Sequence, residues 1–160
     1  MLKIISGGQT GVDRGALDAA LNLGVECGGW CPAGRLAEDG IIPERYPVIE
    51  LEDGGYAERT AQNVVDSDGT LIISNGEPIG GTRGTIERCI EKGKPYLIIN
   101  YREMSTLEAK GKALTFWQNR CIRRLNVAGP RASQWPEGHA LTCQIMSAIL
   151  RRISGQKDAN

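Results

Sequence analysis

The sequence predicts a three-layer α/β domain with a mainly parallel central sheet, and two observations carry this prediction. Short apolar runs alternate with segments of helical period along the chain, which is typical of a parallel sheet covered by helices on both faces. Glycine-rich turns follow two of the apolar runs, where a strand passes into a helix. Together these patterns indicate a Rossmann-like domain that binds a ligand at the carboxyl ends of its strands.

The first half of the chain supplies three predicted strands, at 2–5, 25–30 and 48–51. A helix over 14–23 is indicated by an apolar face and by Gly24 as its stop; the face comprises Val12, Ala16, Leu17, Ala20 and Leu21. A second helix is predicted over 56–66. Residues 31–55 are rich in proline, glycine and charge, and long irregular stretches of this kind are commonly functional.

The second half repeats the alternation. It contains an apolar strand at 70–74, a glycine-rich loop at 75–84, a helix at 85–92 and a strand at 96–100. Ser105 and Glu108 have the spacing of a capping box, which predicts a helix that runs to about residue 120. A short strand at 125–128 precedes a last helix that Pro136 opens. Its apolar stripe has the clearest helical period in the chain: Leu141, Ile145, Met146, Ile149, Leu150 and Ile153.

The composition limits the size and the partners of the protein. A chain of 160 residues is long enough for one domain with its own core; we assign residues 1–153 to that domain and 154–160 to a polar tail. Nineteen basic and nineteen acidic side chains balance, which argues against a nucleic-acid-binding protein. We expect a cytoplasmic protein without a membrane partner, because no apolar run reaches the length of a span and no signal pattern opens the chain.

The five cysteines do not indicate a metal centre. Cys27 and Cys31 have the spacing CxxxC, but no second ligand pair accompanies them, and a zinc site usually shows one. We therefore predict no metal site and favour packing as the role of these two thiols.

The first glycine-rich stretch is SGGQTGVDRGALDAAL, residues 6–21. It leads from a strand into a helix start, whose unpaired N–H groups and partial positive charge favour anions. Glycines let the backbone approach a ligand, while a hydroxyl and a guanidinium add donors. The stretch therefore predicts a phosphate or anion site that comprises Gly7, Gly8, Thr10, Gly11 and Arg14. For Asp13 two interpretations stay open: it caps the helix, or it orients Arg14 or binds a ligand hydroxyl.

The second stretch, NGEPIGGTRGTIE, occupies residues 75–87 in the same position after a strand. Taken alone, its glycines could simply form a tight turn. Two such stretches at carboxyl ends of strands in one small domain favour a shared phosphate- or oxyanion-bearing ligand. The predicted contributors here are Gly80, Gly81, Thr82, Arg83, Gly84 and Thr85.

Two further stretches are candidates for the same site. CPAGRLAEDGIIPERYP, residues 31–47, places Arg35, Glu38 and Asp39 in a loop with no apolar period. AGPRAS, residues 128–133, follows the last strand and offers Arg131 and Ser133. In both stretches a solvated loop or a capped turn explains the residues equally well.

Four motifs resemble the circularly permuted YpsA-like family of the SLOG superfamily, which includes proteins regarded as molybdenum cofactor carriers. They cover about residues 4–133: SGGQTGVDRGALDAA, GGWCPAGRLAEDGIIPERYP, GGTRGT and LNVAGPR. The resemblance implies a Rossmann-like fold and a pocket between two loops. It implies that one side is formed by Gly7, Gly8, Gln9, Thr10, Gly11 and Asp13, and the other by Gly80, Gly81, Thr82, Gly84 and Thr85.

GGTRGTIE is also similar to the nucleotide-binding signature of the LOG phosphoribohydrolases. This similarity implies Glu87 as a candidate catalytic residue. Ile79 stands where those enzymes usually have proline.

Three functions follow from these patterns. The first is a carrier that holds molybdenum cofactor or molybdate unchanged. The second is a nucleotide-processing enzyme, for which Glu87, Asp13, Asp39 and Glu38 are candidate general bases. The third is a nucleotide sensor. We expect the carrier, assembled as a homodimer or homotetramer through its remaining apolar helix faces, although burial of the sheet explains those faces first.

Overall fold

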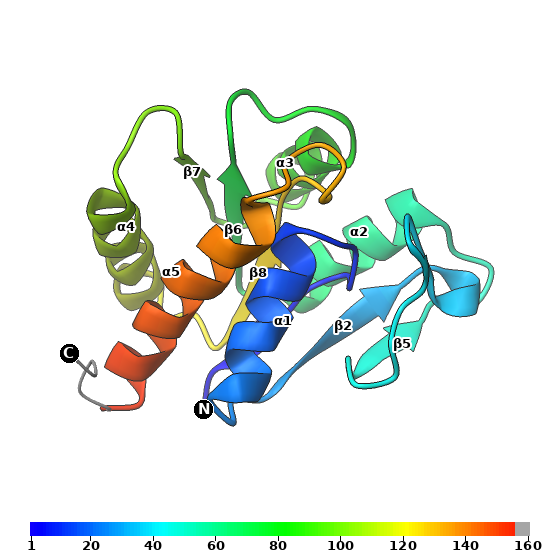
Figure 1. Ribbon diagram of the computed structural model, residues 1–160, viewed down its shortest axis with the longest axis horizontal. Helices are drawn as coiled ribbons and strands as arrows, with labels where there is room; N and C mark the ends of the chain where they lie inside the picture. Colours follow the sequence, from blue (N-terminus) through cyan, green and yellow to red (C-terminus); the bar gives the residue numbers. More distant parts are fainter. Residues whose placement is uncertain (156–160) are drawn as a thin grey trace.

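The computed structural model describes residues 1–155, and its centre is a sheet of six strands (Figure 1). The strands lie in the order β5-β2-β1-β8-β6-β7. Every neighbouring pair is parallel, so all strands end at the same edge of the sheet. Their bounds are β1 Lys3–Ile5, β2 Cys27–Cys31, β5 Val48–Glu50, β6 Gly69–Ser74, β7 Tyr96–Asn100 and β8 Arg124–Ala128.

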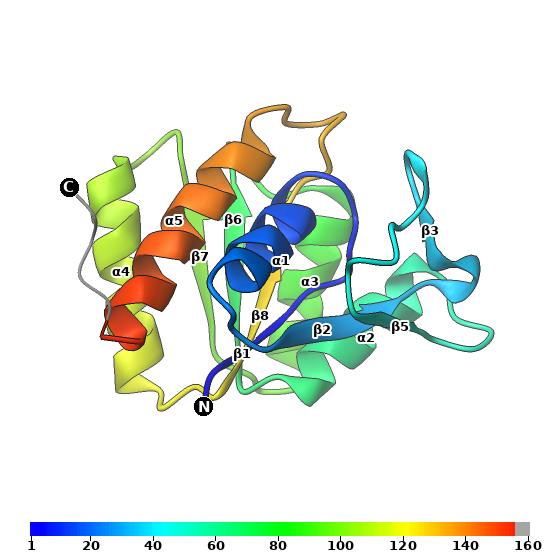
Figure 2. The ribbon, with the colours of Figure 1, turned by 60° about the horizontal axis from the view of Figure 1, so that its bottom comes forward.

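Helices cover both faces of the sheet, which confirms the three-layer α/β prediction (Figure 2). One face carries α1 Val12–Asn22, α4 Thr106–Asn119 and α5 Gly138–Ile153, and the other carries α2 Tyr56–Asp66 and α3 Gly80–Glu91. Strand β6 is buried at each of its positions. Burial on both faces is the reason that β6 reads as a continuous apolar run rather than an alternating one.

The order of the strands positions the ligand site. The chain runs from β1 outward through β2 to β5, and later forms β6 and β7 on the far side of β8. The winding therefore changes direction around β1 and β8. In open parallel sheets ligands bind at the carboxyl ends of the strands where the winding changes. The segments that follow β1, β6 and β8 meet at that place.

One predicted boundary is wrong. Helix α3 begins at Gly80, whereas the sequence predicted a loop over 75–84 and a helix only from residue 85. The prediction placed the helix start at residue 85 because glycine is a poor helix former. The first turn of a helix has free N–H groups in any case, so glycines there can leave them open to another molecule.

The long irregular stretch contains structure that the sequence did not predict. A 3₁₀ turn, η1 Ala33–Arg35, leads into an antiparallel hairpin formed by β3 Leu36–Ala37 and β4 Gly40–Ile41. The chain after the hairpin is anchored by two fully buried side chains, Ile42 and Tyr46. The hairpin is thereby held over the carboxyl edge of the sheet.

The remaining boundaries agree closely with the predictions. The capping box at the start of α4 is confirmed, since the Ser105 N–H donates to Glu108 Oε2 at 2.7 Å and the Glu108 N–H donates to Ser105 Oγ at 3.3 Å. Most of the predicted polar tail, residues 156–160, lies outside the described residues. Over residues 1–155 the longest apolar helices fall short of what a membrane crossing requires.

Candidate functional site

A cavity of about 530 Å³ opens at the carboxyl edge of the sheet. Both predicted glycine-rich segments contribute to it, together with α2 and the segment after β8. Of the residues predicted from sequence, those that line the cavity are Gln9, Asp13, Gly80, Gly81, Thr82, Gly84, Thr85, Glu87 and Arg131. Residues that the sequence analysis missed complete the wall: Tyr56, Ala57, Arg59, Thr60, Arg88, Glu91, Ala128, Gly129 and Gln134.

The start of α3 is open toward this cavity. A Cβ atom built on Gly81 or Gly84 would meet no atom within 4 Å. The N–H groups of Thr82 and Arg83 bond to the Ile79 carbonyl. Within residues 1–155 the N–H groups of Gly80 and Gly81 donate to no protein acceptor. Two free N–H groups at a helix start are the arrangement that binds phosphate and other anions.

Some amides at the start of α1 are used within the protein, and ligand binding by the others stays a prediction. The Gln9 N–H donates to Asp13 Oδ2 at 3.2 Å, and the Thr10 N–H donates to Gln9 Oε1 at 3.1 Å. The Val12 N–H donates to the Pro130 carbonyl at 3.3 Å. These three donors are satisfied internally, whereas the N–H groups of Gly11 and Asp13 donate to no protein acceptor within residues 1–155.

The glycines around α1 serve close packing. A Cβ on Gly7 would lie 1.5 Å from Arg59 Nη1, so the absence of a side chain makes room for that guanidinium. Gly11 precedes α1 with a φ of 81°, and a Cβ there would lie 2.5 Å from the Pro130 carbonyl oxygen. Gly8 has a φ of 77° and turns its carbonyl toward Arg14.

Asp13 and Arg59 form a buried ion pair on the cavity wall. Asp13 Oδ2 lies 3.2 Å from Arg59 Nη1, and only 4% of the Asp13 side chain is exposed. Burial raises the pKa of the Asp13 carboxyl, and the charge of Arg59 opposes that rise only in part. Asp13 is not the helix cap, because Gly11 holds that position. It does not orient Arg14 either, because it accepts hydrogen bonds from Arg59 Nη1 and from the backbone N–H of Gln9.

Two buried donors beside this pair have no acceptor within the described residues: Gln9 Nε2 and Arg59 Nε. The orientation of the Gln9 amide is fixed, because its Oε1 accepts the N–H groups of Thr10 and Glu38 at 3.1 and 3.0 Å. A buried donor without a partner costs about 1–3 kcal/mol. Both atoms are enclosed by the surrounding protein, so a bound molecule would reach them only after a local rearrangement.

Three charged residues that the sequence assigned to the ligand lie away from the cavity wall. Arg14 donates to Asp39 through both terminal nitrogens, at 2.6 and 2.8 Å, and to the Gly8 carbonyl at 3.0 Å. The pKa of Asp39 is held below its usual range by these bonds from Arg14. Arg35 donates to four backbone carbonyls, including that of Val48 at 2.8 Å. All three side chains fix the hairpin region in place.

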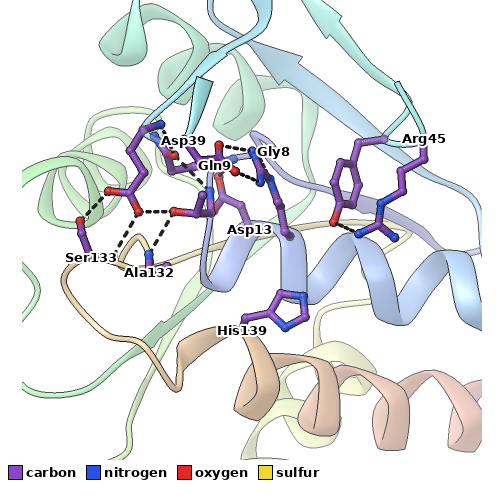
Figure 3. Close-up of polar contacts among 12 residues, drawn as sticks. Gly8, Gln9, Asp13, Asp39, Arg45, Ala132, Ser133 and His139 are labelled. Atoms are coloured by element: carbon purple, nitrogen blue, oxygen red, sulfur yellow. Dashed lines mark hydrogen bonds and ion pairs between the residues drawn. The ribbon is translucent and has the colours of Figure 1, made fainter. Parts of the chain in front are cut away.

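Glu38 joins the hairpin to two other segments of the site. Figure 3 labels Ala132 and Ser133, which belong to the segment after β8, and draws their hydrogen bonds as dashed lines. Its carboxylate accepts a short hydrogen bond from Thr10 Oγ1, one from Ser133 Oγ at 2.5 Å and one from the Ser133 N–H at 3.1 Å. Thr10 Oγ1 accepts in turn from the Ala132 N–H at 3.1 Å. Slight burial by itself would raise the pKa of the Glu38 carboxyl. The hydrogen bonds from Ser133 and Thr10 outweigh this effect, so the pKa of Glu38 is lowered. Thr10 thus serves the junction and does not line the cavity.

The rim of the cavity is mixed in charge. The Arg131 guanidinium lies 5.8 Å from the centre of the Tyr56 ring, a cation–π distance. Arg83 is exposed and donates to Glu87 Oε1 at 3.3 Å, one turn further along α3. Arg83 itself does not line the cavity, whereas Glu87 does.

No group of three metal-binding side chains occurs within residues 1–155. Cys27 and Cys31 are both buried as free thiols. Burial raises the pKa of each thiol, which disfavours the thiolate that metal binding needs. The cavity wall combines hydrogen-bond donors and carboxylates with apolar groups such as Ala57 and Ala128.

Comparisons with known proteins agree with this arrangement. The family model described as "Circularly permutated YpsA SLOG family" matches residues 4–150. A crystal structure named "Putative molybdenum carrier protein", from Syntrophus aciditrophicus SB, is similar with a TM-score of 0.91 and 43% sequence identity. The similarity covers 94% of this chain and 95% of that one. Among curated proteins no match was found. The chain therefore belongs to the circularly permuted YpsA family of SLOG proteins.

Proposed function

We propose that the cavity binds a small organic molecule that carries a phosphate or a similar oxyanion, and that the protein is a carrier of molybdenum cofactor. The observation that carries the proposal is the set of donors around one cavity. The N–H groups of Gly80 and Gly81 stand at the open start of α3, and the basic side chains of Arg59 and Arg131 belong to the wall. Donors of this kind match oxyanions.

The residues present fit such a cofactor. Molybdenum cofactor is a phosphorylated pterin whose own dithiolene holds the metal, so the protein needs donors for the phosphate but no metal ligands. The volume of about 530 Å³ lies within the range of about 300–1,000 Å³ that is usual for organic ligands. A bare molybdate ion would leave much of that space empty. The related crystal structure named as a molybdenum carrier supports the same choice.

A second candidate is a nucleotide-processing enzyme, and one observation favours it. Asp13 lies on the cavity wall with a raised pKa, a property that suits general acid–base catalysis. Glu87 lies on the same wall but is exposed and paired with Arg83. Release of free base from a nucleoside monophosphate, lost in Asp13→Asn or in Glu87→Gln, would establish this reaction in place of the carrier role.

The carrier proposal is tested by direct binding. Purified protein is examined by native mass spectrometry and is then titrated calorimetrically with molybdopterin-type cofactor, molybdate, tungstate, AMP, ADP-ribose and NAD. We expect the phosphorylated cofactor to bind and to be recovered unchanged. Arg59→Gln should weaken that binding, whereas Arg102→Gln, a change outside the cavity wall, should not. The proposal fails if none of these ligands binds the wild-type protein.

A further inference from the structure

Three arginines line the cavity, and the charges of two of them are paired. Arg59 Nη1 lies 3.2 Å from a carboxylate oxygen of Asp13. Arg88 Nη1 lies 2.7 Å from a carboxylate oxygen of Glu91. The third, Arg131, is half-buried, and within residues 1–155 its guanidinium has no carboxylate partner and donates no hydrogen bond. Arg131 is therefore the cation of this wall whose charge and donors are available to an anion.

The Arg131 guanidinium is carried by a short segment after β8, residues 131–134, which we call the rim segment. One end is anchored by Pro130, whose carbonyl accepts from the first N–H of α1 at 3.3 Å, and the other by the buried ring of Trp135. Between these anchors, the hydrogen bonds that the rim segment donates to distant parts of the described chain all end at Thr10 or Glu38.

Glu38 is the common acceptor of these bonds. Its carboxylate accepts from the Ser133 N–H at 3.1 Å and from Ser133 Oγ at 2.5 Å. It also accepts from Thr10 Oγ1, the atom that binds the Ala132 N–H. The backbone N–H of Glu38 donates to Gln9 Oε1 at 3.0 Å, so the acceptor itself is fixed. Glu38 thus supports the rim segment from outside the cavity, which it does not line.

We infer that Glu38 is a positioning residue, which holds the rim segment so that the Arg131 guanidinium meets the anionic group of a bound ligand. A carboxylate that acted through its charge alone would repel that anion, and its removal would strengthen binding. Support of Arg131 predicts the opposite sign, since loss of Glu38 leaves the guanidinium without a defined place. The sign of the effect therefore separates the two roles.

This inference rests on the proposed function, because it assumes that an anionic ligand occupies the cavity. It adds which cation contacts the anion and which side chain holds that cation. Glutamine at position 38 retains an oxygen that accepts from Thr10 and from the Ser133 N–H, and its amide can donate to Ser133 Oγ. Glu38→Gln thus removes the charge but keeps the support, whereas Glu38→Ala removes both.

The test is a calorimetric titration of these variants with molybdopterin-type cofactor and with AMP. Glu38→Ala should raise the Kd about three- to tenfold, because part of a charge-assisted hydrogen bond from Arg131 is lost. Glu38→Gln should recover most of the affinity. The matched control is Glu44→Ala, which removes an exposed carboxylate that makes no hydrogen bond or ion pair to residues 1–155. This control should not weaken binding.

A double-mutant cycle shows whether Glu38 acts through Arg131. Arg131→Gln alone should raise the Kd about tenfold, and addition of Glu38→Ala to it should have no further effect. A general loosening of the fold would instead weaken binding equally with and without Arg131, so the two effects would add. If Glu38→Ala does not fold, Ser133→Ala takes its place in the cycle, because it removes one support of the rim segment and leaves Glu38 intact.

Two results would overturn the inference and leave the proposed function standing. One is unchanged or tighter ligand binding in Glu38→Ala, or in Ser133→Ala where that variant replaces it. The other is additivity with Arg131→Gln. Failure of both ligands to bind the wild-type protein would overturn the proposed function and this inference together.

Discussion

Replacement of Gly81 by valine should remove ligand binding without harm to the fold. Gly81 lies in the first turn of α3 and lines the cavity, and its N–H has no acceptor within residues 1–155. A Cβ atom at this position would meet no protein atom within 4 Å, and its φ is outside the left-handed region. The branched side chain therefore enters the space where the phosphate is proposed to lie, and it displaces the phosphate from the N–H groups of Gly80 and Gly81.

The size of the effect follows from the hydrogen bonds lost. A hydrogen bond to a charged group contributes about 1.5–3 kcal/mol, so loss of one N–H contact should raise the Kd of a phosphorylated ligand about 10- to 100-fold, and loss of both should raise it further. The free energy of unfolding should change by less than about 0.5 kcal/mol, because valine and glycine differ by only a few tenths of a kcal/mol in helix propensity. Isothermal titration and urea unfolding measure the two quantities.

Gly111→Val is the matched control. Gly111 lies within α4, and a Cβ atom there also meets nothing within 4 Å, but the residue is not part of the cavity wall. Both variants should unfold at nearly the same urea concentration, and only Gly81→Val should lose affinity. Unchanged ligand affinity in Gly81→Val would refute the placement of the phosphate at the start of α3.

The remaining predictions concern a charged wall residue, a close backbone approach and an acidic group. Arg59→Gln should weaken phosphorylated ligands about tenfold in the same titration, and an unchanged Kd would contradict its proposed role. Gly129→Ala should destabilise the fold by about 1–3 kcal/mol, since the new Cβ would lie 2.2 Å from the Ile73 carbonyl oxygen; urea unfolding with a normal midpoint would argue against this contact. Although partial burial alone would raise it, the N–H groups of Arg124 and its neighbour lower the pKa of Asp68. Asp68 therefore stabilises the fold above its unfolded pKa of about 3.9 and loses that contribution as pH falls through the lower folded value. Asp68→Asn should cost about 1 kcal/mol at pH 7 and less at pH 3, and an equal cost at both pH values would contradict the assignment.

Much of the fold could be predicted because burial on both faces leaves a direct mark on the sequence. The runs at 70–74 and 96–100 read as strands because β6 and β7 lie in a parallel sheet between helices. The order of the strands left no comparable mark, since the pairing of β1 with β8 joins segments that are far apart in the chain.

The site was harder to predict, for two physical reasons. Arg14 and Arg35 stand in glycine-rich segments, which suggests ligand contact, but their donors are used by Asp39 and by backbone carbonyls. Arg59 was missed because it lies within an ordinary amphipathic helix, where a charged residue usually faces solvent. Its one signal is spatial: Gly7 makes room for the guanidinium, and a single sequence does not reveal that closeness.

The place of β1 in the sheet has a consequence for biosynthesis. One neighbour of this strand is β2, formed soon after it, but the other is β8, which ends at Ala128. During translation the side of β1 that pairs with β8 therefore stays without a partner strand until most of the polypeptide has left the ribosome. Early termination before that point would release a product with an open edge in what should be its interior, and such edges promote aggregation.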